Sequence, residues 1–363
     1  MKILIVKTSS MGDVVHTMPT ITDIAAHLPG AVIDWVVEKP FASLPAMHPA
    51  VRNVIPIAWR KWRKSLWKAD TRAAIAEARR ALKAERYDLV LDLQGLVKSA
   101  LWAVQANGPR AGYDRASARE PLAALFYQRT ANVPKALHAV ERSRRLAAVH
   151  LGYDIGDTPP RFALAAPTGA WQPTASRYAV LITGASRPEK LWPEPSWLAI
   201  AARLRDAGYG LVWLWGSPSE QERCQCLAVQ AGGEVPPFLT VADAAAVLAK
   251  ASLCVGLDTG FSHIAAAFGV EHLIAVNLAR DSEGRYTGVA PQAHLALRVR
   301  QVRALTQHLT AAGQRVQATP MSDGTPRIYI EDPFGNRLEL IEAAGPRLTY
   351  ARPRRVTDLR LSV

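Results

Sequence analysis

Gly12-Asp13 is the first place in the chain where residue type and position suit catalysis. The pair follows the apolar run KILIVK (2–7), which is typical of a strand buried on both faces. An α/β fold places its active groups at the carboxyl edge of such strands, so the Asp13 carboxylate could act as a general base. Asp also favours helix N-caps, and capping alone would explain the residue.

The strongest pattern is the turn GLDTGFSH (256–263), which contains Asp258, Thr259, Gly260 and His263. It joins a predicted strand to the start of a predicted helix over residues 263–268. A helix N-terminus presents unpaired N–H groups and the positive end of the helix dipole to an anion. His263 could add a hydrogen bond to a diphosphate. A capping Asp and a core His explain the turn less completely, because several polar residues converge there.

Two further segments each allow two interpretations. The loop TGASRPEK (183–190) contains small residues and Lys190, and it suits either a phosphate or an ordinary connection between a strand and a helix. The segment WRKWRKSLWK (59–68) interleaves cations with tryptophans. This pattern suits an anionic amphiphile or a membrane surface, or a solvated helix with its tryptophans packed inward. No nucleic-acid-binding motif accompanies it.

The elements around these segments alternate between strand and helix. A strand at 2–7, a helix at 14–27 and a strand at 31–38 form a βαβ unit, which predicts a parallel, doubly wound sheet. A Pro- and Gly-containing linker at 157–175 precedes a second α/β series over residues 177–258. Two Rossmann-like halves place a ligand cleft at the carboxyl ends of their strands.

Composition narrows the class of protein further. A chain of 363 residues is long enough for two or three domains. Its net charge of +13 indicates either an acidic partner or a general bias of the proteome toward basic residues. No apolar run of membrane-spanning length occurs, and the apolar run at the N-terminus is too short for a signal peptide. The three cysteines, Cys224, Cys226 and Cys254, lack metal-ligand spacing, which favours a reducing cytoplasm.

Several motifs together resemble the family of ADP-heptose:lipopolysaccharide heptosyltransferases, in particular its type I members. The resemblance covers residues 1–270, about three quarters of the chain. It rests on motifs in the same order as in the family: KTSSMGDVVHTMP (7–19), WRKWRK (59–64), LQGLVKSA (93–100), SAREPLAALFY (117–127), HAVERSRRLA (138–147), WGSPSEQER (215–223) and VGLDTGFSH (255–263).

The resemblance implies a GT-B fold with the active site between two Rossmann-like domains. It also implies an inverting, metal-independent transfer of L-glycero-D-manno-heptose from ADP-heptose to the Kdo of Kdo-lipid A, in the cytoplasm at the inner-membrane surface. Asp13 matches the catalytic base. The residues matching the ADP-heptose site are Ala185, Ser186, Lys190, Glu220, Asp258, Thr259, Gly260 and His263. The residues matching cations that meet the acceptor are Arg60, Arg63, Lys64 and Arg119.

The resemblance to this family ends after residue 270. The segments HLALRV (294–299) and RIYIEDPFGNRLELIE (327–342), with a helix at 301–312, resemble one βαβββ module of the vicinal oxygen chelate (glyoxalase-like) superfamily. That resemblance implies His294 and Glu339 as candidate ligands of a divalent metal. A site of this kind usually draws ligands from two modules, and only one is present. The alternative is a strand-forming tail without a site.

Four parts are therefore expected. They are an acceptor domain (1–165), an incomplete ADP-heptose-binding domain (173–270), the glyoxalase-like module (271–345) and a basic tail (346–363). The expected partners are ADP-heptose, Kdo-lipid A and the inner membrane, with no nucleic acid and no cofactor for the transfer. Two alternatives to a heptosyltransferase remain. One is a metal-dependent lyase or dioxygenase acting through the C-terminal module, and the other is an impaired chimera that only binds nucleotide.

Overall fold

The structure is a computed structural model, and residues 1–277 and 278–363 form two separate compact units in it. It describes residues 1–185, 191–274, 295–299, 301–320, 325–331 and 337–342. Among these residues, no helix is long and apolar enough to cross a membrane.

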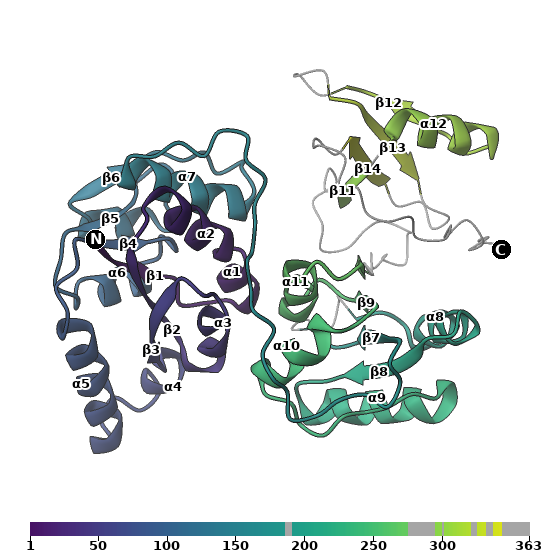
Figure 1. Ribbon diagram of the computed structural model, residues 1–363, viewed down its shortest axis with the longest axis horizontal. Helices are drawn as coiled ribbons and strands as arrows, with labels where there is room; N and C mark the ends of the chain where they lie inside the picture. The colour runs from purple at the N-terminus through teal and green to yellow at the C-terminus, as the bar shows by residue number, and fades with distance from the viewer. Residues whose placement is uncertain (186–190, 275–294, 300, 321–324, 332–336, 343–363) are drawn as a thin grey trace. The chain divides into compact units, whose positions relative to one another are not determined.

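A six-stranded parallel sheet opens the first unit, with the strand order β3-β2-β1-β4-β5-β6 (Figure 1). The apolar run at the N-terminus forms the central strand β1, as the sequence predicts. Ile3 and Ile5 pack toward one face of the sheet, while Leu4 and Val6 pack toward the other. The strands are β1 (Lys2–Val6), β2 (Val32–Glu38), β3 (Val51–Ile57), β4 (Leu89–Asp92), β5 (Arg110–Tyr113) and β6 (Arg129–Ala131).

Helices cover both faces of this sheet, as expected of a doubly wound fold. The prediction of one continuous helix over residues 14–27 is wrong, because α1 ends at Val15 and α2 begins at Met18. Pro19 has no N–H to donate to the carbonyl of Val15, so the first helix cannot continue through it. The helical elements of this part are α1 (Met11–Val15), α2 (Met18–His27), η1 (Lys39–Phe41), α3 (Ser43–Ala46), α4 (Trp59–Trp62), α5 (Ala69–Lys83), α6 (Val97–Ala103), η2 (Pro121–Phe126) and α7 (Ala139–Leu151).

A second parallel sheet follows the linker, with the strand order β10-β9-β7-β8. Its inner face shares one apolar cluster with the first sheet, and α1 packs against α11. The prediction of two Rossmann-like halves is therefore confirmed. The elements are β7 (Tyr178–Ile182), α8 (Glu194–Asp206), β8 (Gly210–Leu214), α9 (Pro218–Ala231), α10 (Val241–Ala249), β9 (Leu253–Gly256), α11 (Gly260–Ala267) and β10 (His272–Ile274).

The second unit contains a small mixed sheet in the order β11-β14-β13-β12, with one helix. β11 and β14 are parallel, whereas the other two pairs are antiparallel. Val302, Ile328 and Leu340 form its apolar cluster. The backbone N–H groups of Gln301 and Val302 donate to the Glu342 carboxylate at 2.9 and 2.7 Å, which caps the helix. The elements are β11 (Leu295–Val299), α12 (Val302–Ala311), β12 (Gln317–Ala318), β13 (Arg327–Glu331) and β14 (Arg337–Glu342).

Candidate active site

Asp13 lies in the first turn of α1, directly beyond the carboxyl end of β1. Its Oδ2 accepts hydrogen bonds from the backbone N–H of Ser10 at 2.8 Å and from the Ser10 hydroxyl at 3.0 Å. Ser10 is the N-cap residue and Asp13 is the third residue of the helix, so the two form a capping box. The carboxylate therefore caps the helix and still lies, partly exposed, at the edge where an α/β fold carries its chemistry.

The charges around Asp13 keep its carboxyl group ionised. Burial raises the pKa of Asp13, but the nearby Lys7 ammonium, the two Ser10 hydrogen bonds and Arg119 together hold it below its usual value. The Arg119 Nη1 is 3.9 Å from the Asp13 Oδ2. A group that is ionised throughout the neutral pH range can always accept a proton, which is the first requirement for a general base.

Lys7 is the main site residue that sequence reasoning missed. It reads as a solvated flank of an apolar strand, yet it is only 7% exposed, and its ammonium donates to the carbonyl of Leu93 at 3.0 Å. Burial lowers the pKa of Lys7, while Asp13 and Asp92 oppose that shift. Its position in the sequence could have identified it, because Lys7 is the last residue before the loop that carries Asp13.

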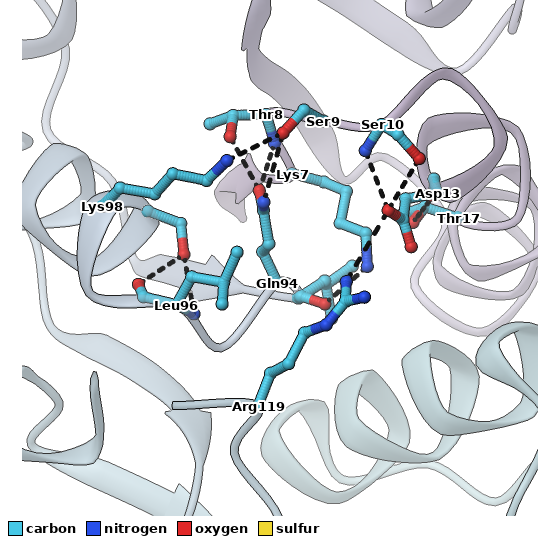
Figure 2. A network of polar contacts seen from close by, with 12 residues as sticks. Lys7, Thr8, Ser9, Ser10, Asp13, Thr17, Gln94, Leu96, Lys98 and Arg119 are labelled. Atoms are coloured by element: carbon cyan, nitrogen blue, oxygen red, sulfur yellow. Dashed lines mark hydrogen bonds and ion pairs between the residues drawn. The ribbon is translucent and has the colours of Figure 1, made fainter. Parts of the chain in front are cut away.

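The turn after β4 and the start of α6 form hydrogen bonds to the loop that carries Asp13 (Figure 2). The Gln94 side-chain carbonyl accepts hydrogen bonds from both the N–H and the hydroxyl of Thr8, each at 2.7 Å. The Lys98 ammonium donates to the Ser9 hydroxyl at 3.0 Å. Buried hydrogen bonds of this kind restrict the loop to one conformation. Gln94 and Lys98 belong to the motif LQGLVKSA (93–100), but nothing in their spacing predicted that they hold the Asp13 loop in place.

A cavity of about 510 Å³ separates this loop from the second half of the unit. One wall contains Ser10, Met11 and Gly12, and the opposite wall contains most of the residues predicted to hold the ADP-heptose. Those lining residues are Ala185, Glu220, Asp258, Thr259, Gly260 and His263. The structure thus brings together six of the eight residues predicted for that site. Ser186 and Lys190 lie outside the described residues.

The two walls approach each other most closely where α1 meets α11. A Cβ atom on Gly12 would lie 2.8 Å from the His263 Cδ2, and one on Gly260 would collide with the Met11 side chain. Because α11 begins at Gly260, rather than at residue 263 as predicted, His263 lies at the end of its first turn. Thr259 is the N-cap residue, but its hydroxyl makes no hydrogen bond to the helix. The N–H groups of the first turn adjoin the cavity and suit an anion.

Glu220 occupies the equivalent place on α9, where Ser217 is the N-cap residue. Its Oε2 accepts a hydrogen bond from the Gly216 N–H at 2.8 Å. Gly184, two residues after β7, lies close to the Glu220 side chain, and a Cβ atom there would displace the carboxylate from its present position. The carboxylate lines the cavity, where it can accept hydrogen bonds from a pair of hydroxyl groups such as a ribose diol.

Three imidazoles from separate elements also meet beside the cavity. The centre of the His16 ring lies 4.5 Å from that of His263 and 5.3 Å from that of His138. Burial, followed by the two neighbouring imidazoles, lowers the pKa of His16 to about 4. His16 is therefore neutral near pH 7. It lies within the motif KTSSMGDVVHTMP (7–19), but no role was predicted for it from the sequence.

Three of the four cations predicted for the acceptor surround the Asp13 loop. Arg119 forms an ion pair with Asp13. Burial lowers the pKa of Lys98, and the positive charges of Arg60 and Arg119 lower it further. Glu38 lies at the carboxyl end of β2. Burial raises its pKa, and the positive charges of Arg60 and Arg63 oppose that rise. Lys64 lies exposed in the turn after α4, and nothing described joins it to the other three.

The tryptophans of the segment 59–68 divide between its two interpretations. Trp59 and Trp62 pack edge-on or tilted against Trp102, with ring centres 6.2 and 5.9 Å away, so they face inward. Trp67 is 73% exposed and faces solvent. Neither interpretation therefore holds for the whole segment.

The metal ligands suggested for the C-terminal module are not placed. His294 lies outside the described residues. Glu339 lies on β14, paired in register with Ala296 of β11 and Tyr329 of β13, but its side chain is not described. No group of three His, Cys, Asp or Glu residues within the described parts of the chain is arranged to hold a metal ion.

Comparison with known proteins agrees with this geometry. The family glycosyltransferase family 9 (heptosyltransferase) matches residues 75–301, which runs beyond residue 270, where the motif resemblance ends. Lipopolysaccharide heptosyltransferase 1 of Escherichia coli K12 is 46% identical over 270 residues, covering 74% of this chain and 85% of the relative. The Pseudomonas aeruginosa protein of the same name is 45% identical over 278 residues, covering 75% and 78%.

Two solved structures of an E. coli heptosyltransferase are similar as well. WaaC with ADP gives a TM-score of 0.70 at 43% identity and covers 75% of this chain and 86% of its own. WaaC with ADP-2-deoxy-2-fluoro heptose gives a TM-score of 0.72 at 39% identity, covering 86% and 100%. These similarities confirm the prediction of a GT-B arrangement of two Rossmann-like halves.

Proposed function

This chain belongs to glycosyltransferase family 9, the heptosyltransferases, and from that membership we propose that it transfers L-glycero-D-manno-heptose from ADP-heptose to the Kdo of Kdo-lipid A. The observation that carries the proposal is the cavity itself. An ionised carboxylate stands behind one wall, and two helix N-termini with Glu220 form the other. That arrangement suits a displacement in which a hydroxyl attacks from one side and a diphosphate leaves on the other.

Asp13 serves as the base in this reaction. A Kdo hydroxyl oxygen attacks the anomeric carbon of the heptose, the bond from that carbon to the phosphate oxygen breaks, and ADP departs with the bonding electrons. The hydroxyl proton passes to the Asp13 carboxylate. Its lowered pKa makes Asp13 a weak base, so proton transfer accompanies bond formation, when the hydroxyl has become strongly acidic. Attack opposite the leaving group inverts the anomeric centre.

The second wall stabilises the leaving group and holds the nucleotide. Negative charge grows on the diphosphate as the bond breaks, and the N–H groups at the start of α11 together with His263 lie where they can meet it. Glu220 accepts hydrogen bonds from the ribose hydroxyls. Lys190 and Ser186 are proposed for the same phosphates from the sequence alone, because they lie outside the described residues.

The acceptor approaches through the cations around the Asp13 loop. Arg60, Arg63, Lys64 and Arg119 are all exposed, and they can meet the phosphates and carboxylates of Kdo-lipid A. Arg119 contacts Asp13 as well, so it links acceptor binding to the base. We propose that the protein works at the cytoplasmic face of the inner membrane and that the transfer requires no metal.

The proposed domain organisation follows the sequence boundaries except where the C-terminal module begins. Residues 1–165 bind the acceptor and residues 173–270 bind ADP-heptose. Because β10 (His272–Ile274) pairs with β9 and residues 1–277 form one compact unit, we propose that the glyoxalase-like module expected over residues 271–345 begins after β10. Residues 346–363 form the basic tail. We assign no chemistry to the module, since neither of its candidate ligands has a described side chain.

A transfer assay tests the proposed function directly. The full chain is incubated with ADP-heptose and Kdo-lipid A, and both ADP release and the mass of the lipid product are followed. We expect one heptose to be added for each ADP released, with the opposite anomeric configuration to the sugar nucleotide. Release of ADP without a heptosylated product, or retention of configuration, would contradict the proposal.

A further inference from the structure

Helix α6 and the 3₁₀ helix η2 pack together beside the Asp13 loop. Ala100 and Ala123 are both fully buried and belong to one small apolar cluster with Tyr127. The first free N–H of α6, that of Val97, donates to the Glu120 carboxylate at 2.7 Å. Small residues at the contact allow the two elements to lie close to each other.

That outward surface is apolar. Leu101 and Val104 of the α6 segment are 45% and 38% exposed, and Leu122 and Leu125 of η2 are 58% and 66% exposed. Each pair is three residues apart, which places both of its side chains on the same side of the helix. Scattered single exposed leucines are ordinary, whereas four large aliphatic side chains on two packed elements suggest an interaction surface.

The same two elements begin at the reaction centre. Lys98, in the first turn of α6, donates to Ser9 of the Asp13 loop. Arg119, which contacts Asp13, lies two residues before η2. On its other side α6 packs through Trp102 against α4, which opens the cationic segment 59–68. The apolar surface therefore extends outward from the place where a lipid-linked acceptor would enter.

The charge of this region favours an anionic partner. Its carboxylates are engaged internally, because Glu120 caps α6 and Asp114 accepts hydrogen bonds from Ser117 and Asn132. Residues 96–130 carry five cations against two carboxylates: Lys98, Arg110, Arg115, Arg119 and Arg129 against Asp114 and Glu120. Exposed aliphatic side chains in a segment with an excess of cations suit the headgroup region of a bilayer that contains anionic lipids.

We propose that the surface of Leu101, Val104, Leu122 and Leu125 docks on an anionic lipid bilayer and presents the active site to its lipid-linked acceptor. Four side chains are too few for a stable protein interface, which buries about 1,200 Å² or more, but they suffice for shallow insertion aided by charge. The second half of this proposal rests on the proposed function, whereas bilayer docking alone does not.

Vesicle binding by the full chain tests the docking. Sedimentation with phosphatidylcholine vesicles is compared with and without phosphatidylglycerol, with no substrate present. The double variant Leu122→Ser/Leu125→Ser should lower the partition coefficient for anionic vesicles about tenfold or more, because two leucines no longer insert. The matched control Val149→Ser/Val229→Ser changes side chains that are 62% and 87% exposed on α7 and α9, and it should bind as the unmodified chain does.

Several results would overturn the docking proposal. They are failure of the unmodified chain to bind anionic vesicles, equal binding by the leucine variant, and an equal loss in the valine control. A chain that is dimeric by analytical ultracentrifugation and becomes monomeric in the leucine variant would instead identify the surface as a contact between copies.

A second readout separates docking from catalysis. The leucine variant should transfer heptose to a deacylated, water-soluble acceptor at the unmodified rate, and lose rate only when the acceptor is embedded in vesicles. Vesicle binding without any transfer would contradict the proposed function and leave the docking intact. An equal loss of rate on both acceptors would show that the leucines support the active site instead.

Discussion

The two walls of the cavity differ in the groups that carry their charge. The wall built on β1 holds side-chain charges, with Asp13 fixed by Ser10 and its loop fixed by Gln94 and Lys98. The wall built on β7–β9 combines backbone N–H groups at helix starts with the side chains of Asp258, Glu220 and His263. Backbone N–H groups at a helix start suit a diphosphate, and Asp13 is the carboxylate held ionised beside the first wall, so we infer that the first wall performs the proton transfer and the second binds the nucleotide.

Asp13→Asn is the strongest test of this division. Asparagine keeps the shape of the residue but cannot take the proton of the attacking hydroxyl, so kcat should fall about a thousandfold. The KM for ADP-heptose, or the Kd for ADP measured by calorimetry, should change little. Ser10→Ala serves as the control, because it removes one hydrogen bond to Asp13 and keeps the carboxylate. A variant Asp13→Asn that retains more than a tenth of its kcat would refute the role of base.

Glu220→Gln tests the opposite wall. The amide can still accept from the Gly216 N–H, but it loses the charge that strengthens hydrogen bonds to the ribose hydroxyls. A charge-assisted hydrogen bond contributes about 1.5–3 kcal/mol, so KM for ADP-heptose should rise roughly 10- to 100-fold at nearly constant kcat. Glu222→Gln, which removes an exposed charge from the same helix, is the matched control. If kcat falls and KM does not, the two walls are not divided as we infer.

Gln94→Ala asks whether the first wall depends on its buried support. Gln94 is 5% exposed, and its loss leaves the buried Thr8 N–H without its acceptor. An unsatisfied buried donor lowers the free energy of unfolding by about 1–3 kcal/mol. Because the loop then becomes less ordered, kcat should fall roughly tenfold. KM for ADP-heptose should hold, which separates a positioning role from general unfolding. Thermal unfolding of the variant supplies the control for stability, and an unchanged kcat would exclude the positioning role.

Much of this fold could be predicted because its strands are continuous apolar runs. The run KILIVK predicted β1 to within one residue, and the turn GLDTGFSH predicted a helix start at residue 263, three residues after α11 begins at Gly260. The break between α1 and α2 was missed, although Pro19 was visible in the sequence. The apolar spacing continues across the break, and that spacing outweighed the missing N–H of a single proline.

Six of the eight residues predicted to bind ADP-heptose line one cavity, and their roles stay predictions. Asp13 and His263 were singled out because each follows a strand or begins a helix, whereas Glu220 was identified through the family resemblance alone. Lys7 and His16 are site residues because distant segments bury them, and one sequence without relatives carries no record of such contacts. Of the cations predicted for the acceptor, Arg60, Arg63 and Lys64 lie in a segment whose interleaved cations and tryptophans already suggested an anionic partner, whereas Arg119 was identified through the family resemblance alone.

His16 joins the two walls, and the pH dependence of unfolding tests that junction. Its pKa is about 4 in the folded chain, against about 6.5 for an unperturbed histidine. Between these values the unfolded chain takes up a proton that the folded chain excludes, so the free energy of unfolding falls as pH drops from about 6.5 to about 4. Because the ring is partly exposed, we expect a loss of only about 1–2 kcal/mol.

The measurement is urea unfolding of the full chain and of His16→Gln at about pH 7 and about pH 4.5. The variant is expected to lose less stability over this interval than the unmodified chain, because it has removed one group that the fold keeps unprotonated. His48, whose pKa burial also lowers to about 4, lies outside the histidine cluster and provides the matched variant His48→Gln. If His16→Gln changes the pH dependence of KM for ADP-heptose and His48→Gln does not, protonation of His16 affects ADP-heptose binding through the contact between the two walls. Equal effects of the two variants on KM would show that acid acts on the fold alone.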